Sequence, residues 1–163
     1  MPTAVRMDIE QATNVSHIVR ERLRQTVLAD PLAFDYVNLD TLRPLCVSAA
    51  NMAIDEVVAR GVAVDQIHAY AFWVTLPGYF THHYLIGLHG DGTFAQALKI
   101  DPTATQFGQE QTVFPAGEYV SASRTFSPQR VDAVPLEQLL VVGRAESYRS
   151  HELRKIMQTC STS

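Results

Sequence analysis

The spacing of the hydrophobic residues changes at Gly61, and this change constrains the fold more than any other feature. Before Gly61, apolar residues recur every three or four positions, which predicts two helices over residues 10–29 and 45–60. After Gly61, apolar and polar residues alternate and aromatic residues are frequent, as expected of strands. The alternating segments are residues 67–76, 80–88 and 94–100. The order predicts an α+β fold, with a helical N-terminal half packed on an antiparallel sheet.

The C-terminal part of the chain has a weaker pattern. Residues 108–134 are rich in Gly, Pro and Ser, which favours a long loop-rich segment with one or two short strands. Residues 136–142 fit a helix and a strand equally well, and residues 146–157 are typical of a C-terminal helix. At 163 residues with 47% hydrophobic content, we expect one domain over residues 1–163, ending in a flexible tail at 158–163.

Composition limits the classes of partner and the compartment. The net charge is -4, so no nucleic-acid or anionic membrane surface is expected. No apolar run approaches the roughly 20 residues of a membrane span, and the first residues do not resemble a cleavable signal peptide. We therefore expect a protein that is cytoplasmic as synthesised. Export by a system that reads no cleavable signal is the alternative.

The two cysteines do not form a disulfide framework. Cys160 lies in the polar tail and is expected to be a free thiol. Cys46 begins the second predicted helix, where unpaired backbone N–H groups and the helix dipole favour a thiolate. The same N–H groups, notably that of Val47, are suited to holding an oxyanion. Cys46 as a small buried hydrophobic residue is the alternative interpretation.

A histidine pair and an aspartate follow Cys46 on the predicted strands. His82 and His83 are adjacent, so only one of them can face Cys46, and we assign this role to His82. Asp101 ends the third predicted strand, where a carboxylate can hold an imidazole in one tautomer. The order nucleophile, base and orienter predicts a cysteine hydrolase or acyltransferase. A strand histidine and a turn-forming Asp-Pro pair without catalytic roles are the structural alternative.

These residues resemble the transglutaminase-like branch of the papain-like cysteine enzymes. The resemblance covers roughly residues 45–107, with Cys46 at a helix start, His82-x-Tyr84 on a strand and Asp101-Pro102-Thr103 ending the next strand. The extension to Gln106 and Phe107 is similar to bacterial members that carry Asp-x-Thr-x-x-Gln-Phe. It implies a papain-like fold with a catalytic core at about residues 40–110, with Cys46 as nucleophile, His82 as general base and acid, and Asp101 as orienter.

The resemblance also implies a substrate class. Cys46 would attack a carboxamide or peptide carbonyl of a protein or peptide substrate and form a thioester, without a cofactor or metal. Glutamine deamidation is the first choice, and proteolysis and transamidation are the alternatives. Trp73, Tyr84 and Gln106 are the substrate-site candidates. A small catalytic core without other domains is similar to bacterial effector or toxin domains, by analogy alone.

Other classes of function fit the sequence less well. A zinc site built from Cys46, His82, His83 and His89 lacks the close paired spacing of structural zinc sites. The glycines near His89 do not follow the strand-to-helix order of a phosphate loop, and no serine lies in a Gly-x-Ser-x-Gly motif. A papain-like fold that serves as a non-catalytic binding module is the main rival. The sequence leaves the oligomeric state open.

Overall fold

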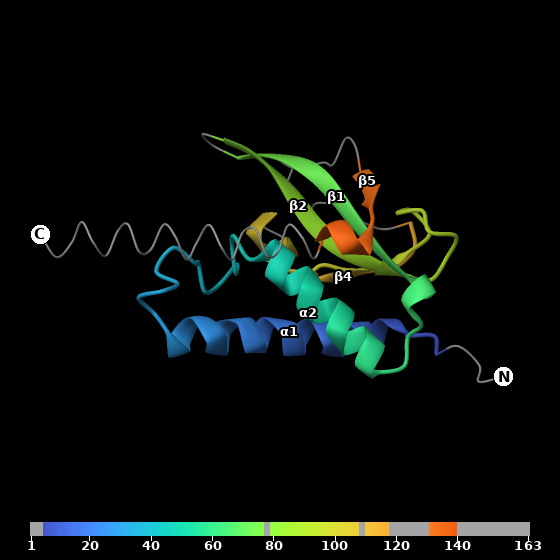
Figure 1. Ribbon diagram of the computed structural model, residues 1–163, viewed down its shortest axis with the longest axis horizontal. Helices are drawn as coiled ribbons and strands as arrows, with labels where there is room; N and C mark the ends of the chain where they lie inside the picture. Colours follow the sequence, from blue (N-terminus) through green and yellow to red (C-terminus); the bar gives the residue numbers. More distant parts are fainter. Residues whose placement is uncertain (1–4, 77–78, 108–109, 118–130, 140–163) are drawn as a thin grey trace, which may run out of the picture.

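The computed structural model describes residues 5–76, 79–107, 110–117 and 131–139, and within them the side chains outside residues 73–82. It is an α+β structure in which two helices cover one face of a five-stranded antiparallel sheet (Figure 1). The helices are α1 (Ile9–Ala29) and α2 (Cys46–Ala59). The predicted fold class and both predicted helices are confirmed, each helix within one residue at either end.

Local chemistry fixes the ends of the helices. Asp8 and Gln11 form a capping box at the start of α1, because each side chain accepts a hydrogen bond from the other residue's backbone N–H. α2 begins differently, since its N-cap residue Leu45 has no side-chain acceptor to offer. Gly61 follows α2 with φ +93°, a left-handed conformation that favours glycine.

The sheet has the strand order β4-β3-β2-β1-β5, and every neighbouring pair is antiparallel. Its strands are β1 (Ile67–Leu76), β2 (Tyr79–Leu88), β3 (Leu98–Ile100), β4 (Val113–Phe114) and β5 (Val131–Val134). Two one-turn 3₁₀ helices, η1 (Val64–Gln66) and η2 (Ala104–Phe107), precede β1 and follow β3. The first two predicted strands and the short strands expected within residues 108–134 are confirmed.

The third predicted strand is too long at its N-terminal end. Residues 94–97 belong to turns and β3 begins only at Leu98. The carbonyl of Thr93 accepts hydrogen bonds from the backbone N–H groups of Gln96 and Ala97, which closes a turn. The Asp91 carboxylate accepts from the backbone and hydroxyl of Thr93 and so stabilises this turn. Local side-chain hydrogen bonding therefore overrides the alternating pattern.

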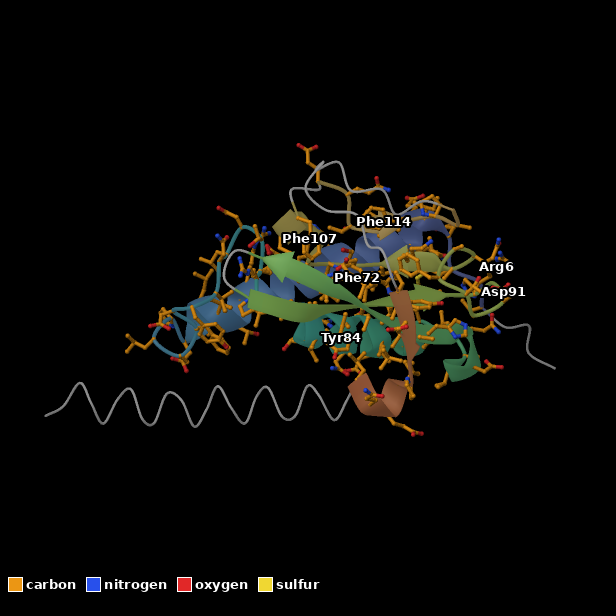
Figure 2. All side chains as sticks on the ribbon, turned by 90° about the horizontal axis from the view of Figure 1, so that it is seen from above. Arg6, Phe72, Tyr84, Asp91, Phe107 and Phe114 are labelled. Atoms are coloured by element: carbon orange, nitrogen blue, oxygen red, sulfur yellow. The ribbon has the colours of Figure 1, made fainter. Side chains whose placement is uncertain are left out.

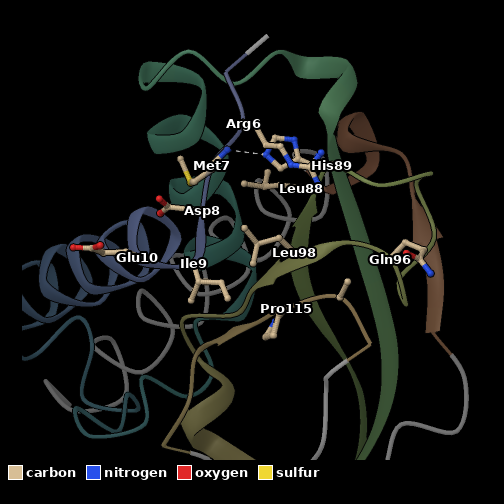
Figure 3. Close-up of a pocket in the computed structure, with 11 residues that line it drawn as sticks. Arg6, Met7, Asp8, Ile9, Glu10, Leu88, His89, Gln96, Leu98 and Pro115 are labelled. Carbon is tan, nitrogen blue, oxygen red and sulfur yellow. Dashed lines mark hydrogen bonds between the residues drawn. The ribbon is translucent and has the colours of Figure 1, made fainter.

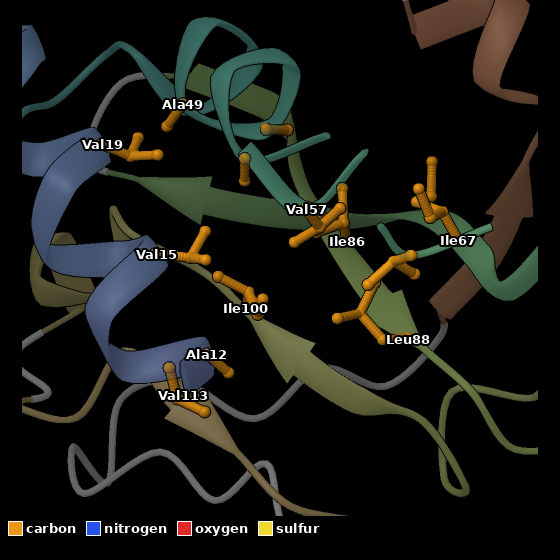
Figure 4. Packing of buried hydrophobic residues seen from close by; sticks show 14 of the residues in the cluster. Ala12, Val15, Val19, Ala49, Val57, Ile67, Ile86, Leu88, Ile100 and Val113 are labelled. Carbon is orange, nitrogen blue, oxygen red and sulfur yellow. The ribbon is translucent and has the colours of Figure 1, made fainter. Parts of the chain in front are cut away.

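The two faces of the sheet bury different kinds of side chain. On the helix-covered face, aliphatic residues of β2 and β3 such as Ile86 and Ile100 meet Val15 of α1 and Val57 of α2 (Figure 4). On the other face, a smaller cluster is built around aromatic rings. Its members are Tyr70, Phe72, Leu85, Ala97 and Phe107, with Phe94 and Val131 packed against them. The buried polar residues His83, Lys99 and Asp101 belong to the same strands or directly follow them.

The C-terminal predictions are tested only in part. Residues 136–139 are helical, which settles the first part of the ambiguous segment 136–142. The predicted helix at 146–157, the tail at 158–163 and Cys160 lie outside the described residues. In the part of the chain that is described, neither helix has the length and apolar character needed to cross a membrane.

Candidate functional site around Cys46, His83 and Asp101

The candidate site lies where β2 extends beyond its neighbour β3. β3 ends at Ile100, which pairs with Ile86, so no described strand pairs with that edge of β2 between Tyr79 and Leu85. His83 lies within this unpaired stretch. Its imidazole contacts three residues from separate parts of the chain: Cys46 at the start of α2, Asp101 directly after β3 and Gln106 in η2.

Asp101 binds His83, the residue after the histidine that the sequence analysis assigned. Its Oδ2 lies 2.7 Å from His83 Nε2, and both side chains are buried. The pairing of Ile86 with Ile100 extends to Leu85 opposite Asp101, so Asp101 shares its face with Leu85 and His83. His82 has the opposite parity along the strand. The imidazole of the candidate site therefore belongs to His83, and the side chain of His82 lies outside the described residues.

The Cys46 thiol lies close enough to the same imidazole to influence its pKa. Burial alone lowers the pKa of His83, but the charge of Asp101, its hydrogen bond, and the nearby Cys46 together raise that pKa above its ordinary value. A partly buried thiol thus lies beside a buried pair of imidazole and carboxylate. This arrangement can move a proton from sulfur to nitrogen and stabilise the resulting imidazolium.

The second ring nitrogen of His83 has a partner as well. Gln106 Nε2 lies 3.0 Å from His83 Nδ1 and 3.3 Å from Thr103 Oγ1. Gln106 was a substrate-site candidate in the sequence analysis, and the structure places it directly on the imidazole.

Aromatic rings complete the surroundings of the imidazole. The Phe107 ring meets it edge-on at a centroid distance of 4.7 Å, and the Phe72 ring lies at 5.0 Å (Figure 2). Both phenylalanines are buried, so they keep water from this part of the ring. A low-polarity wall strengthens the electrostatic interaction between His83 and Asp101.

The first turn of α2 supplies backbone donors beside the thiol. The first N–H groups of a helix have no acceptor within the helix, and Leu45 provides no side-chain cap. Val47, whose side chain is buried, follows Cys46 in this turn. Its backbone N–H is therefore suited to the oxyanion role expected from the sequence.

Arg20 of α1 joins the two segments that carry Cys46 and Asp101. Its guanidinium donates to the Asp40 carbonyl at 3.0 Å, to Thr105 Oγ1 at 3.1 Å and to the Pro102 carbonyl. Thr105 Oγ1 in turn donates to the Thr41 carbonyl at 3.3 Å. The loop before Cys46 and the turn after Asp101 are thus tied to each other and to α1.

The two remaining substrate-site candidates have different outcomes. Tyr84 packs against the larger aliphatic cluster, on the face opposite to His83 (Figure 2). Trp73 pairs with His82 across the β1–β2 ladder, as expected, but its side chain lies outside the described residues. Of the three candidates, Gln106 is the one that the structure brings to the imidazole.

A separate hollow of about 450 Å³ lies at the other end of β2 (Figure 3). Leu88, His89 and the N-terminal residues Arg6 and Met7 line part of it. His89 Nε2 accepts a hydrogen bond from the backbone N–H of Met7 at 3.0 Å. Burial, together with the charges of Arg6 and His68, lowers the pKa of His89. This histidine fastens the N-terminal segment to the sheet and takes no part in the site around His83.

Sequence reasoning missed Arg20, Thr105 and Phe107 as parts of the site. Phe107 carried a signal, because it belongs to the Asp-x-Thr-x-x-Gln-Phe pattern that was read as a motif. Arg20 carried none, since a single arginine in an amphipathic helix resembles any solvent-facing charge. Within the described residues, no three His, Cys, Asp or Glu side chains gather in the manner of a metal site.

Comparisons with known proteins give no relative from which a function could be inferred. No family model, no curated protein and no solved structure matches the chain. The function is therefore argued from the chemistry of Cys46, His83 and Asp101.

Proposed function

We propose that this protein is a cysteine-dependent hydrolase or acyltransferase that attacks a carboxamide, and that it deamidates glutamine side chains of proteins. The observation that carries the proposal is the buried His83–Asp101 pair with the Cys46 thiol beside the same imidazole. Three residues that lie far apart in the sequence and fit the roles of nucleophile, base and orienter meet in one place.

The architecture supports a papain-like, transglutaminase-like assignment. Cys46 is the first residue of a helix that packs on an antiparallel sheet, and His83 and Asp101 come from neighbouring strands. Moving the base from His82 to His83 departs from the His-x-Tyr pattern, because Leu85 now stands where the tyrosine was expected. The Asp-x-Thr-x-x-Gln-Phe pattern gains support, since Asp101, Gln106 and Phe107 all contact the imidazole.

In the acylation step, His83 takes the proton of the Cys46 thiol and the sulfur attacks the carboxamide carbon. The carbonyl oxygen becomes an oxyanion, for which the Val47 N–H in the uncapped first turn of α2 is the nearest helix donor by position. The carbon–nitrogen bond then breaks, His83 returns the proton to the leaving nitrogen, and ammonia departs. A thioester between Cys46 and the substrate acyl group remains.

In the deacylation step, His83 removes a proton from water and the resulting hydroxide attacks the thioester. The carbon–sulfur bond breaks, the sulfur recovers a proton, and a carboxylic acid is released. Asp101 keeps its hydrogen bond to Nε2 throughout and stabilises the imidazolium form in both steps. The overall change is amide plus water to acid plus ammonia.

The test compares products formed by the wild-type protein and by Cys46→Ala in a cell lysate prepared in heavy-oxygen water. Deamidation predicts glutamine peptides that gain about 1 Da plus the label, because water resolves a thioester formed from a side-chain amide. New peptide termini would indicate proteolysis, and glutamine–amine adducts would indicate transamidation. Identical products from both proteins, or none, would favour a non-catalytic binding module.

Two adjacent histidines provide a matched pair for the same assay. His83→Asn should abolish the labelled products, because Asp101 and Cys46 both depend on this imidazole. His82→Asn should retain them, since Asp101 is bound to His83. Loss of products in His82→Asn alone would return the base to the residue first expected from the sequence.

A further inference from the structure

The side chain of Gln106 lies on the ring nitrogen that the proposed reaction needs. Asp101 is bound to Nε2 of His83, so Nδ1 is the nitrogen left to exchange a proton with Cys46. Gln106 Nε2 lies 3.0 Å from this Nδ1. The amide therefore meets the base at the point where thiol and substrate must reach it.

We propose that Gln106 is a gate on the base: its carboxamide caps His83 Nδ1 in the resting protein, and the carboxamide of the substrate displaces it. This inference rests on the proposed function and adds a control to the same site. A group bound to the base is normally released before the base takes a proton from the nucleophile.

The tautomer of His83 explains why this contact opposes proton transfer. An ionised carboxylate only accepts hydrogen bonds, so Nε2 donates to Asp101. In the neutral ring, Nδ1 then has one lone pair in the ring plane, and Gln106 donates to it. The lone pair cannot accept the thiol proton while it accepts the amide hydrogen. The second amide hydrogen faces Thr103 Oγ1 at 3.3 Å, so the nitrogen of the carboxamide has an acceptor for each hydrogen.

The other groups described around His83 do not oppose proton transfer at Nδ1 in this way. Asp101, which follows β3, and Cys46 of α2 are the titratable groups that raise its pKa, against the lowering effect of its burial. β1 and η2 contribute the rings of Phe72 and Phe107. Lys99 of β3 donates to the carbonyls of Ala97 and Pro115, and Arg20 of α1 donates to Pro102, Thr105 and Asp40. Among the described residues around the imidazole, Gln106 is the donor directed at Nδ1.

The gate has the same chemical group as the proposed substrate. In the acylation step, the leaving amide nitrogen has to receive a proton from His83 and must come within hydrogen-bond distance of it. Gln106 Nε2 already holds this kind of position relative to Nδ1. A substrate carboxamide that displaces Gln106 can therefore form the same hydrogen bond to Nδ1, whereas an ester or an apolar side chain cannot.

The experiment measures how fast Cys46 is alkylated by iodoacetamide as a function of pH, followed by mass spectrometry of the Cys46 peptide. Gln106→Leu keeps the approximate volume but removes the donor. If Gln106 caps the base, the midpoint of alkylation should move to lower pH by about one unit, the effect expected for one hydrogen bond. Gln106→Met should shift the midpoint in the same direction.

Gln111→Leu is the control, because Gln111 is an exposed glutamine that donates to the Val113 carbonyl, away from His83. Its midpoint should equal that of the wild type. A midpoint in Gln106→Leu and Gln106→Met that is unchanged or moves to higher pH would overturn the gate. Circular dichroism and a thermal melt identify any variant that fails to fold. If one of the two Gln106 variants does not fold, the alkylation midpoint of the other decides the test.

Alkylation requires no turnover, so it separates this inference from the proposed function. If the alkylation midpoint shifts as expected but no labelled glutamine product forms, Gln106 controls a reactive thiol and the deamidase proposal is wrong. If labelled products form but the alkylation midpoint is unchanged in Gln106→Leu, the deamidase proposal stands and the gate proposal is wrong.

Discussion

Two histidines mark the two ends of the segment 83–89, which runs from the middle of β2 to the residue after it, and their surroundings are opposite. His83 lies within β2 beside a carboxylate and a thiol, whereas His89 directly follows the strand and accepts from the backbone of Met7. Asp101 and Cys46 raise the pKa of His83, while burial and the charges of Arg6 and His68 lower that of His89. The surroundings therefore make a proton easier to bind at His83 and harder to bind at His89.

The comparison separates a reactive histidine from a structural one. Burial is common to both, so burial alone does not indicate chemistry. The partners differ: His83 is linked to side chains that can exchange protons, and His89 to a backbone N–H that cannot. The two rings are six residues apart, about 20 Å along an extended strand, so they act independently.

The largest effect should come from removing the charge at the His83 end. Asp101→Asn keeps the shape of the side chain but removes the charge that stabilises the imidazolium. We expect turnover in the glutamine assay to fall by roughly 10²-fold or more. The alkylation midpoint of Cys46 should move to higher pH, since the imidazolium of His83 that stabilises the thiolate is less favoured without the charge of Asp101.

Asp91→Asn is the control for this substitution, because Asp91 supports the turn near the His89 end through its bonds to Thr93. It should leave both turnover and the alkylation midpoint unchanged. Equal losses in the two variants would mean that Asp101 acts through the fold and not through His83.

A smaller effect should follow from releasing the segments that hold the His83 end. Arg20→Ala removes the donors to Asp40, Pro102 and Thr105. We expect a loss of about 1–3 kcal/mol in the free energy of unfolding, as for hydrogen bonds from a charged group. Amide hydrogen exchange should become faster in residues 101–107 but not around His89.

Arg24→Ala is the matched control on the same helix, because Arg24 donates a hydrogen bond to the Leu39 carbonyl at 3.2 Å. Its cost should be smaller, and exchange in residues 101–107 should stay as in the wild type. Arg20→Lys should fall between the two, since an ammonium group cannot reach three acceptors with the geometry of a guanidinium.

Much of the fold could be predicted from the sequence because periodicity depends on burial. The change of period at Gly61 separated helices from strands, and the long hairpin of β1 and β2 was found nearly to the residue. The start of β3 was misplaced because Asp91 and Thr93 form a local turn within an alternating segment. Such side-chain turns leave the hydrophobic pattern unchanged, so the pattern cannot reveal them.

The histidine assigned from the sequence lies one residue before the one that Asp101 binds, and this difference has a definite cause. Cys46 and Asp101 were identified from residue type and position, and both contact the imidazole. Choosing between His82 and His83 required the register of β2 against β3, which the sequence does not encode locally. A shift of one residue exchanges the two faces of a strand, so His82 was as compatible with the pattern as His83.

The smallest effect should appear at the His89 end, in the dependence of stability on pH. The pKa of His89 is lowered in the folded protein, so the unfolded chain binds more protons once the pH falls below its ordinary pKa of about 6.5. The contribution to stability is therefore complete above that pH and is lost as the pH falls through it. We expect stability, measured by urea unfolding, to fall as the pH is lowered below about 6.5.

His89→Asn should remove this part of the pH dependence. Asparagine tolerates the positive φ of 64° at this position and does not titrate in the range. His17→Asn is the control, because His17 is exposed on α1, and it should keep the wild-type dependence. If His89→Asn loses stability below about pH 6.5 as the wild type does, another group is responsible, and the opposition between the two ends of the segment 83–89 would rest on His83 alone.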